Sequence, residues 1–138
     1  MKETYVTYET SKLLKEKGFD WECRAYWHED DRELIESQSP CYLRNITNPC
    51  WFGNAAPTQQ MACRWLREEH KMFISIGVGT DIDGVFGYMP EIYFLEELDS
   101  DVGMYGPNVD SETICDFTPQ SPEDAIEAAL KFALTNLI

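Results

Sequence analysis

Residues 71–98 read KMFISIGVGTDIDGVFGYMPEIYFLEEL, and this stretch carries the main strand signal of the chain. Isoleucine or valine occupies every second position from Ile74 to Val78, which is the period of a half-buried strand. Asp83-Gly84 predicts a tight turn, because glycine reaches positive φ at little steric cost. Pro90 lies in the returning strand, where its missing N–H restricts it to a sheet edge or a bulge. We therefore expect an antiparallel hairpin.

A helix is expected well before this hairpin, over residues 7–19. Thr7 suits the N-cap position, where a hydroxyl accepts a hydrogen bond from an amide of the first turn. Gly18 suits the left-handed position that ends a helix, and Phe19 would then fold back toward Leu14. Signals at both ends thus define this helix.

Two further helices are expected, one before the hairpin and one at the end of the chain. The first covers residues 58–70, where Arg64 and Glu68 have the spacing of a surface ion pair. The second begins at Ser121 and Pro122, an N-cap residue followed by a proline at the first helical position. Its apolar stripe consists of Ile126, Ala129, Leu130, Ala133, Leu134 and Leu137.

Weaker signals fill the rest of the chain. Alternation over residues 22–29 predicts a strand, and residues 29–33 read as a polar turn. A second short strand is expected around residues 41–45, followed by an irregular loop over residues 45–57, which are rich in Asn, Pro and Gly. Residues 96–120 read as a long acidic connection with a short apolar piece.

Together these elements predict an α+β fold in the order αββαββα. About three helices would pack on one face of a mainly antiparallel sheet of three to four strands. The length of 138 residues suits one domain, residues 1–138, that folds without disulfides or a structural metal.

Charge is distributed unevenly along the chain. There are 11 Lys and Arg residues against 25 Asp and Glu residues, which gives a net charge of −14. Residues 72–130 contain 13 of the acids (25 less 12 in residues 1–71) and no Lys or Arg. Direct binding to nucleic acid or to an anionic membrane is therefore not expected, because both need basic side chains. The sequence favours a basic protein partner, or simply a solvated acidic surface.

Cysteine usage and the N-terminus predict a cytosolic protein. The five cysteines are odd in number and show no CxxC spacing, so we interpret them as reduced thiols. The N-terminal residues MKETYVTYETSKLL lack the apolar core of a signal peptide. No apolar run reaches the length of a membrane helix.

The two histidines are the main candidates for catalysis. His28 precedes three acids, Glu29, Asp30 and Asp31, but adjacent strand residues point to opposite faces and do not converge on a metal. His70 lies at the end of the expected helix 58–70, where a structural role is favoured. We expect no catalytic residue, metal or cofactor. A small hydrolytic or metal-dependent enzyme that uses His28 or His70 with nearby carboxylates is the alternative.

Candidate partner contacts lie in two loops. Trp51 and Phe52, between a proline and a glycine, suit an exposed anchor or a small hydrophobic cluster under the loop. The acidic connection contributes the other candidates, which are Glu96, Glu97, Asp99, Asp101 and Tyr105. A second alternative is a small-ligand site lined by Trp51, Phe52 and Tyr105.

Three blocks resemble a known group of proteins: ETSKLLKEKGF, APTQQMACRWLREEH and PEDAIEAALKFAL. They are similar to an uncharacterised family of small acidic proteins encoded by gut bacteria and by their phages and prophages. The sequence departs from the family pattern at Ser121–Asp124, where an aromatic residue and two glutamates are more usual. The resemblance implies a bacterial cytoplasm and a mobile-element origin, and it implies no mechanism.

The leading hypothesis is a non-enzymatic accessory protein of phage type that acts through protein contacts. Its acidic surface would face a basic or nucleic-acid-binding protein, and one form of this hypothesis is mimicry of nucleic-acid charge. Oligomeric state stays open, because Pro90 would hinder pairing at one strand edge while the net charge does not forbid a dimer.

Overall fold

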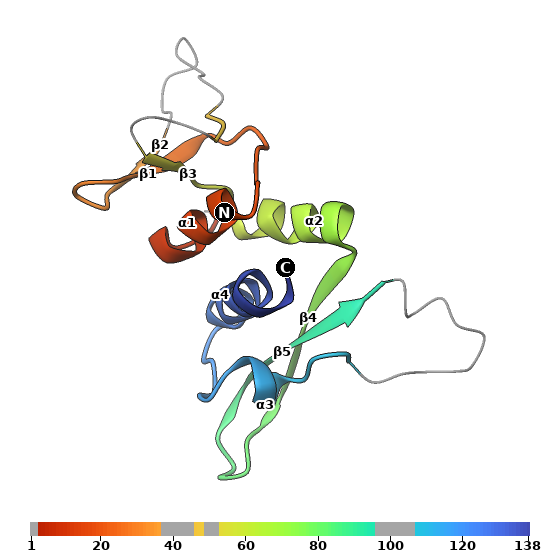
Figure 1. Ribbon diagram of the computed structural model, residues 1–138. Coiled ribbons are helices and arrows are strands. Elements are labelled where there is room, and N and C mark those ends of the chain that lie inside the picture. Colours follow the sequence, from red (N-terminus) through yellow and green to blue (C-terminus); the bar gives the residue numbers. More distant parts are fainter. Residues whose placement is uncertain (1–2, 37–45, 49–52, 96–106) are drawn as a thin grey trace.

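A computed structural model describes residues 3–36, 46–48, 53–95 and 107–138 (Figure 1). In chain order the elements are α1 (Tyr8–Glu16), β1 (Ala25–His28), β2 (Leu34–Glu36), β3 (Gly53–Ala55), α2 (Gln59–His70), β4 (Met72–Thr80), β5 (Phe86–Phe94), α3 (Ser111–Ile114), α4 (Pro122–Phe132) and the π-helical η2 (Ala133–Leu137).

The predicted α+β class is confirmed, with the strands divided between two antiparallel sheets. The described strands form one sheet in the order β2-β1-β3 and a hairpin of β4 and β5. Figure 1 shows α1, α4 and α2 between the two sheets. α1 contacts β3 and α4, while α2 and α4 contact the hairpin. The helices therefore form a layer with the three-stranded sheet at one end and the hairpin at the other.

The predicted capping of α1 is confirmed at both ends. The Thr7 hydroxyl accepts a hydrogen bond from the amide of Thr10, and Gly18 adopts a positive φ of 90°. The amide of Phe19 then donates to the carbonyl of Leu14 over 2.9 Å. This reversal buries Phe19 and Leu14 completely, so the local stop signal also supplies two core residues.

Caps and pairs predicted for the other two helices are also present. The amide of Met61 donates to the Thr58 hydroxyl at the start of α2, and Ser121 accepts from Asp124 at the start of α4. Arg64 Nε lies 2.9 Å from a Glu68 carboxylate oxygen on the exposed face of α2. The apolar stripe of α4 continues into η2, and its buried members are Ala129, Leu130, Ala133 and Leu134.

Two strands and a short helix differ from the sequence expectations. The loop expected over residues 45–57 contains β3, which pairs with β1. Gly53 permits this pairing, because a Cβ atom there would lie 2.1 Å from the carbonyl oxygen of Trp27. β2 was not foreseen, and α3 lies within the acidic connection. The strand expected at 41–45 falls outside the described residues.

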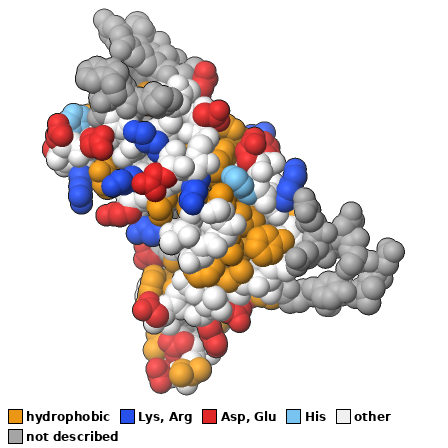
Figure 2. Space-filling model, viewed as in Figure 1, with side chains coloured by type: hydrophobic (Ala, Val, Ile, Leu, Met, Phe, Trp, Pro, Cys, Tyr) orange, Lys and Arg blue, Asp and Glu red, His pale blue; other side chains and the backbone are white. Residues whose placement is uncertain are grey.

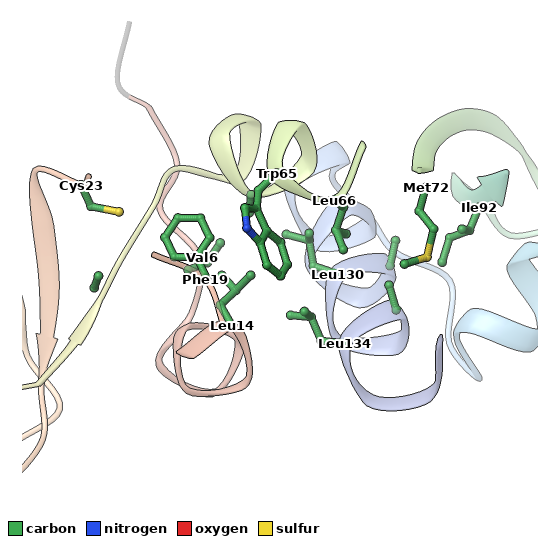
Figure 3. Close-up of a cluster of buried hydrophobic side chains, with 14 of the residues drawn as sticks. Val6, Leu14, Phe19, Cys23, Trp65, Leu66, Met72, Ile92, Leu130 and Leu134 are labelled. Carbon is green, nitrogen blue, oxygen red and sulfur yellow. The ribbon is translucent and has the colours of Figure 1, made fainter. Parts of the chain in front are cut away.

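One cluster of buried side chains joins the helices to the hairpin (Figure 3). Trp65 of α2 contacts Phe19 edge to face, with ring centroids 5.5 Å apart. Figure 3 shows Leu130 of α4 and Leu134 of η2 between this group and the hairpin. The hairpin contributes Met72 and Ile92, which are buried at its base.

Candidate interaction surface

The β4–β5 hairpin is longer than the helix layer that covers it. Its even-numbered residues share one face, since Met72 pairs with Phe94 and Val78 with Tyr88. Met72 is 2% exposed at the base of this face, whereas Val78 is 65% exposed and Phe86 58% exposed toward the turn. The apolar face therefore continues beyond the core and meets solvent.

The end of the hairpin and Phe117 of the covering segment, whose neighbour Thr118 binds Asp81, form an exposed apolar group that we call the apolar tip. It consists of Val78, Ile82, Val85, Phe86 and Phe117. Ile82 is 95% exposed and contributes nothing to the core. Large apolar side chains gathered at one exposed place are typical of surfaces that bind a partner.

Asp81 holds the turn that presents this tip. Its Oδ1 accepts hydrogen bonds of 2.9 Å from the amides of Asp83 and Val85. Its Oδ2 accepts a 2.6 Å hydrogen bond from the Thr118 hydroxyl. The Thr118 bond, with the amide bonds, lowers the pKa of the Asp81 carboxyl below its ordinary value. Gly84 has a φ of 81°, so the predicted Asp83-Gly84 turn is confirmed.

Residues 107–120 cover the outer edge of β5. Ile92 and Val109 exchange two backbone hydrogen bonds of 3.0 Å, and the amide of Tyr88 donates to the carbonyl of Pro119. Pro90 lies between these contacts, and like its neighbours at 88 and 92 its nitrogen faces away from β4. The edge position predicted for Pro90 is therefore confirmed.

Charge at this end of the molecule is of one sign. Figure 2 shows carboxylates and apolar side chains at the end that carries the hairpin turn, and Lys and Arg over the helices. Asp83 and Asp116 are exposed beside the apolar tip. The first base on the N-terminal side is Lys71, at the start of the hairpin. The tip therefore lies in a region of negative potential.

Some carboxylates of residues 72–130 are used inside the fold. Asp110 caps α3 by accepting from Thr113, both from its amide and from its hydroxyl. Glu127 of α4 accepts from the Thr10 hydroxyl at 2.6 Å and from the Thr7 amide at 3.1 Å. Gln59 of α2 donates to the same carboxylate over 3.3 Å. Glu127 is half-buried, and its hydrogen bonds connect three helices.

A separate groove of about 360 Å³ lies along α1. Its lining residues are Tyr8, Glu9, Lys12, Leu13, Glu16 and Arg32. The Arg32 guanidinium lies 4.8 Å from the centre of the Tyr8 ring, so two of the lining residues form a cation–π contact. Acids and bases are balanced here, and neither histidine lines the groove.

The two histidines lie against different residues. His28 Nδ1 lies 2.9 Å from Asp31 Oδ1, without the alignment of a hydrogen bond. The His70 ring packs against Trp65, with centroids 4.7 Å apart. Within residues 3–36, 46–48, 53–95 and 107–138, no three His, Cys, Asp or Glu side chains are placed to share a metal ion.

The cysteines that the structure describes are protonated near neutral pH. Burial raises the pKa of the Cys23 thiol to about 12 and that of Cys63 to about 11. Burial also raises the pKa of Cys115. Because the thiolate is the nucleophile, these three residues are not suited to nucleophilic catalysis.

The partner contacts predicted from the sequence lie outside the described residues. This applies to Trp51, Phe52, Glu96, Glu97, Asp99, Asp101 and Tyr105. The apolar tip was missed as a site, although the turn that carries it was predicted. Its signal was Ile82 between two aspartates in a tight turn, where a polar residue is the usual choice.

Comparisons with known proteins add no identification. No family model matches the chain, and neither the curated proteins nor the solved structures contain a match. In the part of the chain that the structure describes, no helix is both long and apolar enough to span a membrane.

Proposed function

We propose that this chain is a non-enzymatic interaction module that binds a basic protein through the apolar tip and the carboxylates around it. One observation carries the proposal: exposed apolar side chains are gathered at the end of a hairpin that belongs to a 59-residue stretch without Lys or Arg. A basic or nucleic-acid-binding protein is the partner of matching charge.

Physical reasons favour this combination of groups. An apolar side chain such as Ile82 supplies binding free energy when a partner removes it from water. Exposed carboxylates such as Asp83 and Asp116 add little to affinity, but they steer a positive partner and repel a negative one. The tip would provide the anchor and the carboxylates the selectivity.

Mimicry of nucleic-acid charge is a narrower form of the same proposal. It needs carboxylates that stay free and repeat at regular spacing. Asp81, Asp110 and Glu127 are held in internal hydrogen bonds, which reduces the free set. We therefore favour a partner that recognises the tip with its apolar centre over one that responds to charge alone.

The enzymatic and small-ligand alternatives have less support. Neither His28 nor His70 lines the groove along α1, and the three described thiols have raised pKa values. Residues proposed to line a ligand site, Trp51, Phe52 and Tyr105, lie outside the described part of the chain. We propose a bacterial cytoplasm as the setting of this interaction, and the resemblance to phage and prophage proteins is its support.

Affinity capture from a bacterial lysate tests the proposal with matched baits. We expect the chain to retain proteins with a pI above roughly 9, and moderate salt to release them. Ile82→Ser should abolish retention without unfolding the bait, because Ile82 is 95% exposed. Ile35→Ser is the control, since it removes an apolar side chain from β2 in the other sheet.

A second pair of baits tests the charge. Asp83→Asn with Asp116→Asn should slow association and reduce the salt dependence of capture, whereas Asp30→Asn with Glu33→Gln changes the net charge equally and should alter neither. Identical protein sets on all baits, or retained proteins that are not basic, would contradict the proposed function.

A further inference from the structure

Within the described part of the chain, backbone groups along the outer edge of β4 have no partner. Lys71 accepts a hydrogen bond from Leu95 just before β4, and Asp81 donates one to Val85 just after it. Hydrogen-bonded pairs alternate along an antiparallel ladder, so the residues of β4 that bond to β5 are the odd-numbered ones. The amides and carbonyls of Ile74, Ile76 and Val78 therefore face away from β5. Among the described residues, these three amides have no backbone or side-chain acceptor.

Nothing in the sequence of β4 protects this edge. Proteins usually blunt an exposed edge with lysine, proline, a bulge or a covering segment. β4 reads MFISIGVGT, so it has no charged residue and no proline over nine residues. The described residues place no strand beside it, although residues 107–120 cover the other edge of the same hairpin.

We propose that the outer edge of β4 binds an extended segment of the basic partner as an added strand. This inference rests on the proposed function and names the place and the mode of binding. Strand addition uses main-chain hydrogen bonds for affinity and alternate side chains for specificity. The open amides at 74, 76 and 78 supply donors at the spacing that an added strand requires.

The two faces of the hairpin define the side chains of that segment. On the even face, an added strand would lie beside Ile76 and Val78 and would bury them with apolar residues. On the odd face it would lie beside Ser75, a small residue, with Glu91 directly behind it on β5. A Lys or Arg side chain can reach over Ser75 toward the Glu91 carboxylate. The fitting segment therefore alternates apolar and basic residues.

Charge argues against a second copy of this chain as the occupant. Pairing β4 with β4 would bring together two chains of net charge −14 and two stretches without a base. A basic segment instead neutralises the field of residues 72–130. We therefore commit to a basic segment from another protein.

Two substitutions at Val78 separate the contribution of its backbone amide from that of its side chain. Val78→Pro removes an outward-facing donor and leaves the inner ladder intact, as Pro90 does on β5. Val78→Ala removes the same apolar contact and keeps the donor. Both variants should fold, because Val78 is 65% exposed.

The probe is a labelled peptide of nine residues, the length of β4, with Val and Lys in alternation. We expect it to bind the full chain and to slow amide exchange at Ile74, Ile76 and Val78. Val78→Pro should weaken binding by about tenfold or more, and Val78→Ala by less than about threefold. Peptides with Glu in place of Lys, or with N-methylated alternate amides, should not bind.

Any other result with these peptides overturns the strand-addition proposal. The combination of peptide binding and lysate capture then shows whether the proposed function is also overturned. If plain and N-methylated lysine peptides bind equally, the contact is electrostatic and the proposed function survives alone. If neither lysine peptide binds while basic proteins are still captured through the apolar tip, then the outer edge of β4 is not the binding site of those proteins. A dimer in sedimentation that Val78→Pro dissociates would identify a second copy as the occupant. Failure of both the peptides and the lysate capture would remove the proposed function as well.

Discussion

The two outer edges of the β4–β5 hairpin differ sharply. β5 is closed by Val109 and Pro119, which accept from its outward amides, and by Pro90, which has no amide to offer. β4 has no such cover among the described residues and no proline or charge of its own. A segment of the chain itself therefore covers the edge of β5, whereas no described segment covers the edge of β4.

One glycine in each strand, Gly87 of β5 and Gly77 of β4, shows a difference in the same direction. A Cβ atom at Gly87 of β5 would lie 2.3 Å from Thr118 Cγ2 and 2.7 Å from the carbonyl oxygen of Pro119. At Gly77 of β4 the nearest atom would be 3.9 Å away. The covering segment therefore packs directly on Gly87 of β5. In β4 there is room at Gly77 but not at Gly79, where a Cβ atom would lie 2.9 Å from the Met89 sulfur.

The largest expected effect comes from breaking the closed edge. Gly87→Ala should destabilise the chain by about 2 kcal/mol, because the new methyl group must displace backbone of the covering segment. Gly77→Ala is the matched control and should change stability by less than about 0.5 kcal/mol. Chemical denaturation of both variants measures the difference. Equal effects at the two positions would mean that the edges are not distinct.

A smaller effect is expected from acid, which acts on the bond between Asp81 and Thr118. The folded pKa of Asp81 lies below its ordinary value of 3.8. Its contribution is therefore present above the unfolded pKa and is lost as the pH falls through the lower, folded pKa. Amide exchange at Val85 should be followed as the pH is lowered from 5 to 2. At the acid end of this range, the measured rate should rise relative to the intrinsic exchange rate.

Two asparagine variants identify the responsible carboxylate. Asp81→Asn should give a turn whose protection is weaker at every pH and no longer falls in acid. Asp83→Asn should keep the wild-type response, because no hydrogen bond to its carboxylate holds the turn. An unchanged pH response in Asp81→Asn would assign the effect to another group.

Local features of the fold could be predicted from the sequence. Thr7, Gly18 and Ser121 act through residues within a few positions of themselves, and each was found where its pattern placed it. The Asp83-Gly84 turn and the edge position of Pro90 follow from backbone geometry in the same way. Such signals need no knowledge of the tertiary structure.

Features that depend on distant residues could not be predicted. β3 lies in a segment whose composition is typical of loops, and it forms because Gly53 allows close approach to Trp27. Glu127 meets Thr7 across 120 residues of sequence, and no local pattern indicates this pair. The exposure of the apolar tip depends on how far the hairpin extends past α4. The sequence indicates both strands but not the extent of their cover.

Residue-resolved amide exchange in the free chain tests the central claim most directly. We expect an alternation within β4: amides at Ser75 and Gly77, which face β5, should be protected, and those at Ile76 and Val78 should exchange near their intrinsic rates. Tyr88 and Ile92, on the closed edge of β5, should be protected. Equal protection at every position of β4 would contradict the account, because another segment would then cover the edge proposed to bind the partner.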